Sequence, residues 1–325
     1  MNAHISMQTY AENYFSERRR LGYGLRTPSY SILSFAHYCD DINIGESLTV
    51  EMMADWARQD QGNTGKPATW ALRLKRLRSF CRYLQQFEPR TEVPDDSIFG
   101  HIGQRLAPHI YSEQEIIDLL AAAHNLDSYI PGLRGATYET LFGLIASTGL
   151  RISEALHLLD LDVDLKSGLL TIRKTKFAKS RYVSLHPSTL DALRQYLLLR
   201  NHYIQVSEDT RFFVGARGRW LGQPLGQKQV ERVFVSLRNQ LGWINRGAHN
   251  GPRIHDLRHT FIVRRVLLWQ AQGMDVDQQI LALSTYVGHS MVTNTYWYLT
   301  GIPELMAGAA DKFEVFAHMP EVSYE

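Results

Sequence analysis

The chain has 325 residues, which favours two domains over one, and its apolar fraction of 44% is ordinary for a globular protein. No apolar run is long enough to cross a bilayer, and the polar start, Met1 to Ser16, is unlike a signal peptide. Because Cys39 and Cys81 are the only cysteines and lie far apart, a disulfide framework is not expected, and we predict a reduced, cytoplasmic protein. The net charge of +2 does not by itself identify a binding partner.

Residues 4–99 are predicted to be mainly helical. Helices are expected from Pro28, from Leu48 to Arg58 and, most clearly, from Pro67 to Phe87, where apolar residues recur at steps of four and three. The other faces of the third helix carry basic side chains. Either they form a solvated face or they follow a phosphate backbone, since clustered Lys and Arg bind nucleic acid irrespective of sequence. The residues are Arg73, Lys75, Arg76, Arg78 and Arg82.

A composition break rich in proline, glycine and acids precedes Pro108 and predicts an interdomain linker over residues 100–109. The linker would separate a helical DNA-binding domain, residues 1–99, from a second domain, residues 110–312, and a tail, residues 313–325. In the second domain, Ser112 and Glu115 form a capping box that opens a helix, and another helix is expected at about residues 132–147.

Two strand-like runs, Leu169 to Arg173 and Arg181 to Leu185, predict a β-hairpin with a basic tip that holds Lys174, Lys176 and Lys179. A solvated loop is the ordinary explanation for Lys174 and Lys179. Helices are expected to follow over residues 187–200 and 227–241. The fold class predicted for the whole chain is mainly α with a small β-hairpin or sheet.

Three short stretches carry residues suited to chemistry on phosphate. After Gly149 breaks an apolar run, Arg151 is expected in the first turn of a new helix with Glu154 one turn further on. Arginine offers a rigid fork of donors for phosphate oxygens. Downstream, His255 and Arg258 lie three residues apart, so one helix face would present a proton-transfer group beside a cation.

A zinc site is the alternative for His255 and His259, which are spaced i, i+4, with His289 downstream. The catalytic zinc signature needs glutamate where Asp256 stands, and Arg258 places a cation one turn from His255. The chain also lacks a GxxxxGK[ST] phosphate loop. We therefore predict no metal and no cofactor.

Taken in order, these motifs resemble the tyrosine recombinases, which include phage-type integrases and Xer-like resolvases. The set is T-G-L-R-x-S-E, a hairpin lysine, H-x-L-R-H-T, G-H-S and a tyrosine nine residues after the last histidine, within about Ser112 to Leu305. The resemblance makes Tyr298 the nucleophile in preference to Tyr296. The remaining catalytic residues that it implies are Arg151, Glu154 as a supporting acid, Lys176, His255, Arg258 and His289.

The resemblance implies a site-specific recombinase that cuts and rejoins double-stranded DNA through a 3′-phosphotyrosine. Four protomers would act on two DNA sites, with accessory DNA-bending or partner proteins, away from membranes and on the bacterial nucleoid. Phe313, Val315 and Phe316 in the tail would dock on a neighbouring protomer or fold back on their own core. A type IB topoisomerase and an inactive DNA-binding regulator are the alternative functions. The interval from Arg258 to His289 is longer than in Xer-like members, around residues 272–277.

Overall fold

The computed structural model describes residues 5–42, 47–59, 65–100, 105–126, 132–173 and 180–301, together with Leu305. It divides the chain into two compact units, Met1–Arg105 and Leu106–Glu325. The division falls inside the stretch expected to be a linker. Among the described residues, each hydrophobic cluster draws its members from one unit alone, so each unit has a core of its own.

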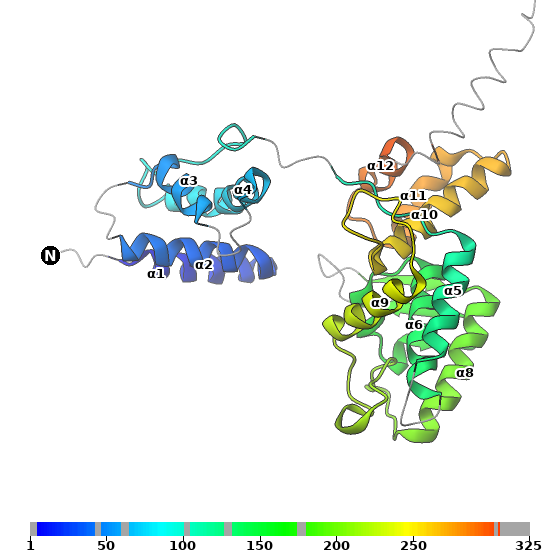
Figure 1. Cartoon of the computed structure of the whole chain (residues 1–325). Helices are drawn as coiled ribbons and strands as arrows, with labels where there is room; N and C mark the ends of the chain where they lie inside the picture. Colours follow the sequence, from blue (N-terminus) through cyan, green and yellow to red (C-terminus); the bar gives the residue numbers. More distant parts are fainter. Residues whose placement is uncertain are drawn as a thin grey trace, which may run out of the picture. The chain divides into compact units, whose positions relative to one another are not determined.

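The first unit consists of helices packed around aromatic side chains (Figure 1, blue to cyan). Phe35 meets Trp56 edge-on, and Tyr14 meets Phe80 in the same way. Helix α4 ends at Leu84, three residues before the predicted end, because Phe87 and Glu88 turn their backbone N–H groups back to the Leu84 carbonyl. The helices are α1 (Met7–Arg20), α2 (Arg26–Asp41), α3 (Val50–Arg58) and α4 (Pro67–Leu84).

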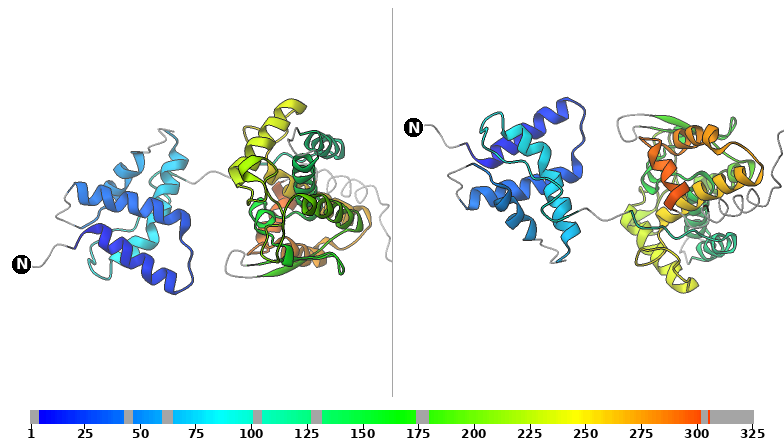
Figure 2. Two further views of the ribbon diagram at one scale, coloured as in Figure 1. Left: turned by 90° about the horizontal axis from the view of Figure 1, so that it is seen from below. Right: turned by 90° about the horizontal axis from the view of Figure 1, so that it is seen from above.

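The second unit is built around a buried helix, α6, which packs against α5, α8 and α10. Figures 1 and 2 show α5, α6 and α8 side by side, while α10, α11 and α12 gather at one end. The helices are α5 (Glu113–His124), α6 (Leu133–Thr148), α7 (Ile152–His157), α8 (Pro187–Tyr203), α9 (Gln227–Leu241), α10 (Ile254–Ala271), α11 (Val276–Val287) and α12 (Thr293–Gly301).

One antiparallel sheet completes the second unit. Its strands, β1 (Val163–Asp164), β2 (Leu169–Ile172) and β3 (Arg181–Ser184), lie in sequence order, with Ile172 opposite Arg181. The short strand β1 was not predicted from the sequence. The tip of the hairpin, residues 174–179, lies outside the described residues. A mainly helical fold with a small sheet is confirmed.

The start of the second unit braces helix α10. The backbone N–H of Tyr111 donates to the Thr260 hydroxyl oxygen at 2.9 Å, and the Tyr111 hydroxyl donates to the Arg253 carbonyl at 3.0 Å. Upstream, both ring nitrogens of the buried His109 contact Arg246. These bonds fix the beginning of α10, the helix that carries the H-x-L-R-H-T motif.

Residues 272–277, where the sequence predicts an interval longer than in Xer-like members, form a turn after α10 and the start of α11. This segment therefore lies between two helices rather than among the catalytic candidates. In the described part of the chain, no helix is both long and apolar enough to cross a membrane.

Candidate active site

Arg151 and Glu154 form one side of the site at the start of α7. Helix α6 ends at Gly149, whose φ of 66° is the left-handed conformation that glycine adopts without strain. Arg151 is the N-cap of α7, one position before the first turn in which it was predicted. Its backbone N–H donates to Oε2 of Glu154 at 2.9 Å, and its Nη1 donates to Oε1 at 2.8 Å.

Arg258 forms the other side. Its guanidinium is buried and donates from Nη1 to the Gly149 carbonyl at 2.6 Å and from Nη2 to the Val287 carbonyl at 2.7 Å. Arg151 donates from Nη2 to the next carbonyl, that of Gly288, at 2.8 Å. These carbonyls stand at the ends of α6 and α11, where a helix carries partial negative charge. Two arginines separated by 107 positions thus converge on one turn (258 minus 151).

The charges at this site suit an anionic ligand. Burial, followed by the charge of the nearby Arg151, lowers the pKa of Arg258 to about 9, so the group remains charged at neutral pH. Burial would raise the pKa of Glu154, but bonds from Arg181 and Arg151 outweigh burial and hold it at about 2. A phosphate bound here would meet preorganised cations.

His255 occupies the edge of the site, one turn before Arg258 on α10. Its side chain is partly open to solvent, yet desolvation, followed by the charge of Arg258, lowers its pKa to about 4. The ring is therefore neutral at physiological pH and able to accept a proton. One turn further on lies the buried His259, whose ring centre is 4.8 Å from that of His255.

Tyr298 on α12 lies within this arrangement and is fully buried. Its hydroxyl shares a 2.6 Å hydrogen bond with Nδ1 of His259, and its ring stacks on that of His289, with centres 6.3 Å apart. Its phenolic group also acts to raise the pKa of Arg258. Nδ1 of His289 bonds the buried Thr295 hydroxyl at 2.7 Å. Tyr296, by contrast, is 38% exposed and interacts with Asp277.

The structure thus brings together Arg151, Glu154, His255, Arg258, His289 and Tyr298. The predicted Lys176, Lys174 and Lys179 lie outside the described residues. In the described ranges no cluster of three His, Cys, Asp or Glu is placed to hold a metal ion. His259 contacts Tyr298 instead of completing the zinc site considered from the sequence.

Sequence reasoning missed three contributors, namely His259 as a partner of Tyr298, Thr295 as a partner of His289, and Arg181. Only His259 had a signal, its spacing from His255. Arg181 appeared merely as the first residue of a strand, but it donates to both carboxylate oxygens of Glu154, at 3.0 and 2.9 Å.

The basic residues of α4 do not form one uniform face. Arg73 donates to the Trp56 carbonyl and lies over the Trp56 ring, Arg76 bonds Ser31, and Arg78 pairs with Asp96 at 2.7 Å. In the DNA-free chain, contacts within the unit therefore engage these three side chains. Lys75 and Arg82 are exposed.

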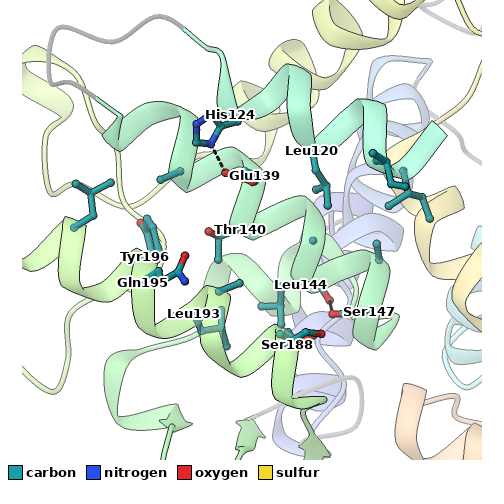
Figure 3. A pocket seen from close by; sticks show the side chains of 18 of the residues that line it. Leu120, His124, Glu139, Thr140, Leu144, Ser147, Ser188, Leu193, Gln195 and Tyr196 are labelled. Carbon is teal, nitrogen blue, oxygen red and sulfur yellow. Dashed lines mark hydrogen bonds and ion pairs between the residues drawn. The ribbon is translucent and has the colours of Figure 1, made fainter. Parts of the chain in front are cut away.

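A separate groove of about 770 Å³ lies between α5, α6 and α8 (Figure 3). Its wall is largely apolar and includes Leu120, Leu144 and Leu193. His124 and Glu139 also line it and are joined by a 2.7 Å hydrogen bond. None of the catalytic candidates lines this groove. The reactive residues instead occupy the junction of α6, α7, α10, α11 and α12.

Comparison with known proteins gives a consistent picture. The phage integrase family matches residues 110–301. The y4rB protein of Sinorhizobium fredii, named as an integrase/recombinase, is 36% identical over 305 residues, which cover 93% of this chain and 95% of that protein. Tyrosine recombinase XerC of Chlamydia caviae is 29% identical over 230 residues, covering 70% of this chain and 65% of XerC.

Solved structures share the fold. The XerH site-specific recombinase, bound to its difH substrate after cleavage, gives a TM-score of 0.65 at 21% identity, covering 94% of this chain and 85% of XerH. The Tn1549 transposon integrase in complex with transposon right-end DNA gives 0.63 at 16% identity, covering 95% and 99% of the two chains. At these identities the likeness is one of fold.

Proposed function

Because the chain belongs to the phage integrase family and is a tyrosine-type site-specific DNA recombinase, we propose that Tyr298 is its nucleophile and that Arg151 and Arg258 hold the phosphate it attacks. The observation that supports this most strongly is the convergence of both guanidinium groups on the consecutive carbonyls of Val287 and Gly288, directly before His289. Tyr298, whose ring stacks on that of His289, is within the same cluster.

The reaction would proceed by transesterification. The phenol oxygen of Tyr298 forms a bond to phosphorus, the bond to the 5′-oxygen breaks, and the 3′ end of the cut strand becomes a phosphotyrosine. A phenol has an ordinary pKa of about 10 and needs a proton acceptor; we assign this role to the neutral His255. The two arginines stabilise charge on the non-bridging oxygens, and His289 donates to them.

The leaving 5′-oxygen takes up a proton, for which the resemblance nominates Lys176. A 5′-hydroxyl from a second strand can then attack the phosphotyrosine and restore the diester, releasing Tyr298. Each step exchanges one phosphoester bond for another, so no high-energy cofactor is needed. Glu154 would support Arg151 without touching the substrate.

Double-stranded DNA is the proposed partner, as in the complexes of XerH and Tn1549 integrase. In the first unit, Lys75 and Arg82 on the exposed face of α4 are the proposed phosphate contacts. We further propose that four protomers assemble on two DNA sites, with accessory DNA-bending or partner recombinase proteins. The C-terminal tail, residues 313–325, lies outside the described residues; removing everything after Ala310 and measuring assembly on DNA by sedimentation tests whether it joins protomers.

A suicide substrate tests the proposed nucleophile. A duplex carrying the recognition site and a nick beside the cleavage position traps the phosphotyrosine, because the short leaving strand diffuses away. The wild-type chain and Tyr296→Phe should form a covalent protein–DNA adduct, and Tyr298→Phe should form none. An adduct that persists in Tyr298→Phe and disappears in Tyr296→Phe would reverse the assignment.

A further inference from the structure

Arg181 is bound to two separate segments of the catalytic site. Its Nη1 and Nη2 donate to the two oxygens of Glu154 at 3.0 and 2.9 Å, a bidentate arrangement that fixes both distance and direction. Its Nε donates to the Tyr286 carbonyl at 2.8 Å. The side chain is 10% exposed and that of Glu154 is 8% exposed, so solvent weakens this pair little.

Through Glu154, Arg181 acts on Arg151. Oε1 of Glu154 receives hydrogen bonds from both guanidinium groups, while Oε2 receives one from Arg181 and one from the backbone N–H of Arg151. The carboxylate thus sits between the two arginines. Without Arg181, each carboxylate oxygen of Glu154 would lose one hydrogen-bond donor. The carboxylate could then rotate and displace the Arg151 guanidinium bound to it.

Arg181 also supports the turn that carries His289. Gly288 adopts a φ of 71°, and a Cβ atom added there would lie 2.7 Å from Nη1 of Arg181. The guanidinium therefore packs directly against the backbone that precedes His289. This contact gives a physical reason for glycine at that position beyond its positive φ.

We propose that Arg181 is a positioning residue for strand cleavage, which holds Glu154 and the Gly288 turn so that Arg151 and His289 face the scissile phosphate. Arg181 begins β3, the strand that follows the hairpin tip, so it also links the hairpin to the phosphate pocket. The inference rests on the proposed roles of Arg151 and His289. It assigns Arg181 no contact with DNA.

The test compares Arg181→Gln with Arg173→Gln, a matched control from the same hairpin. Arg173 directly follows β2 and pairs with the buried Asp162, away from Glu154. On the nicked suicide substrate, Arg181→Gln should form the covalent adduct about 100-fold more slowly than wild type. Arg173→Gln should stay within about 3-fold, and Arg181→Lys should fall between, because lysine keeps the charge but not the fork.

A second substrate separates positioning from general damage. Replacing one non-bridging oxygen of the scissile phosphate by a methyl group removes its charge and much of the demand for well-placed cations. On this methylphosphonate, the deficit of Arg181→Gln should shrink to about 5-fold or less. Unchanged rates in Arg181→Gln on the ordinary substrate, or an equal deficit on both substrates, would overturn the proposal.

The same assay distinguishes failure of this inference from failure of the proposed function. If the wild-type chain forms no adduct, or Tyr298→Phe forms one, the catalytic assignment itself is wrong. If those two controls behave as expected and Arg181→Gln does not, only the positioning role is rejected. DNA affinity, measured by gel shift, should change by less than about 3-fold in Arg181→Gln.

Discussion

At the residue scale, the proximity of some site residues can be predicted from their spacing in the sequence, and that of others cannot. The spacing of His255 and Arg258 predicts a shared helix face, and both lie in the site. The bond between His259 and Tyr298 spans 39 positions, and that between Glu154 and Arg181 spans 27. Such pairs depend on how helices and strands pack, which no local period encodes.

Tyr298 should contribute to stability as well as to catalysis. In Tyr298→Phe, the buried hydrogen bond between the Tyr298 hydroxyl and Nδ1 of His259 is lost, and a typical hydrogen bond contributes about 0.5–1.5 kcal/mol to the free energy of unfolding. Urea denaturation should detect this loss. Tyr296→Phe, a change at a partly exposed position, should stay within about 0.5 kcal/mol of wild type. Equal stability of all three proteins would show that the bond contributes nothing.

His255 should remain neutral in the DNA-free protein down to mildly acidic pH. Its pKa of about 4 lies below the value of about 6.5 expected in the unfolded chain. Between these values the unfolded chain binds more protons, so stability declines as pH falls from about 6.5 towards 4. NMR of the imidazole, assigned by its absence in His255→Gln, should show no titration between pH 8 and 5. A midpoint near 6.5 would contradict the prediction.

At the element scale, the ends of helices do much of the positioning. Gly149 and Gly288 terminate α6 and α11 in the left-handed conformation and expose carbonyls to the arginines from the other segments. The sequence signalled Gly149 as a break, whereas Gly288 appeared only as part of the G-H-S motif. Nothing in the sequence indicated that Arg258 would bind both termini and Arg151 the terminus of α11, because that arrangement follows from the packing of α10 on α6.

Helix α4 shows the limit of counting basic residues. The sequence predicted the helix and its charged faces, but tertiary contacts occupy Arg73, Arg76 and Arg78. A list of charges cannot distinguish a side chain that binds a carbonyl of a neighbouring helix from one that reaches solvent. Lys75 and Arg82 are the residues of this set that the fold leaves exposed.

These two residues should govern the salt dependence of DNA binding by the first unit. Lys75→Gln and Arg82→Gln should each reduce the slope of log affinity against log salt concentration by about 0.9, because each loses one phosphate contact. Titrations at several salt concentrations measure this slope. Arg78→Gln, which removes the pair with Asp96, should leave it unchanged. A larger effect in Arg78→Gln than in the other two would place the DNA elsewhere.

At the scale of the whole molecule, the proline- and glycine-rich break predicts a boundary, and the structure divides the chain into two compact units after Arg105. Ala107 to His109 nevertheless belong to the second unit, because Ala107 accepts from the Ala248 N–H and His109 is buried. Composition indicates where regular helices and strands end, whereas tertiary contacts determine to which unit each residue of the connecting stretch belongs.

The second unit should therefore fold and react by itself. Its hydrophobic clusters lie entirely within residues 106–325. A fragment of these residues should melt cooperatively and still form the adduct with Tyr298 at high DNA concentration. Its affinity for the site should fall by about 100-fold or more, because the second point of attachment is gone. If the fragment is unfolded, the second unit is not stable without the first.

The complete burial of Tyr298 has a consequence for the cell that carries this protein. A chromosome presents an immense excess of phosphodiesters that are chemically identical to the intended one. If Tyr298 is the nucleophile proposed above, its hydroxyl has no accessible surface from which to attack them in the DNA-free fold. We therefore expect cleavage to require DNA binding that moves α12 and uncovers this hydroxyl, so that the resting fold limits stray incisions.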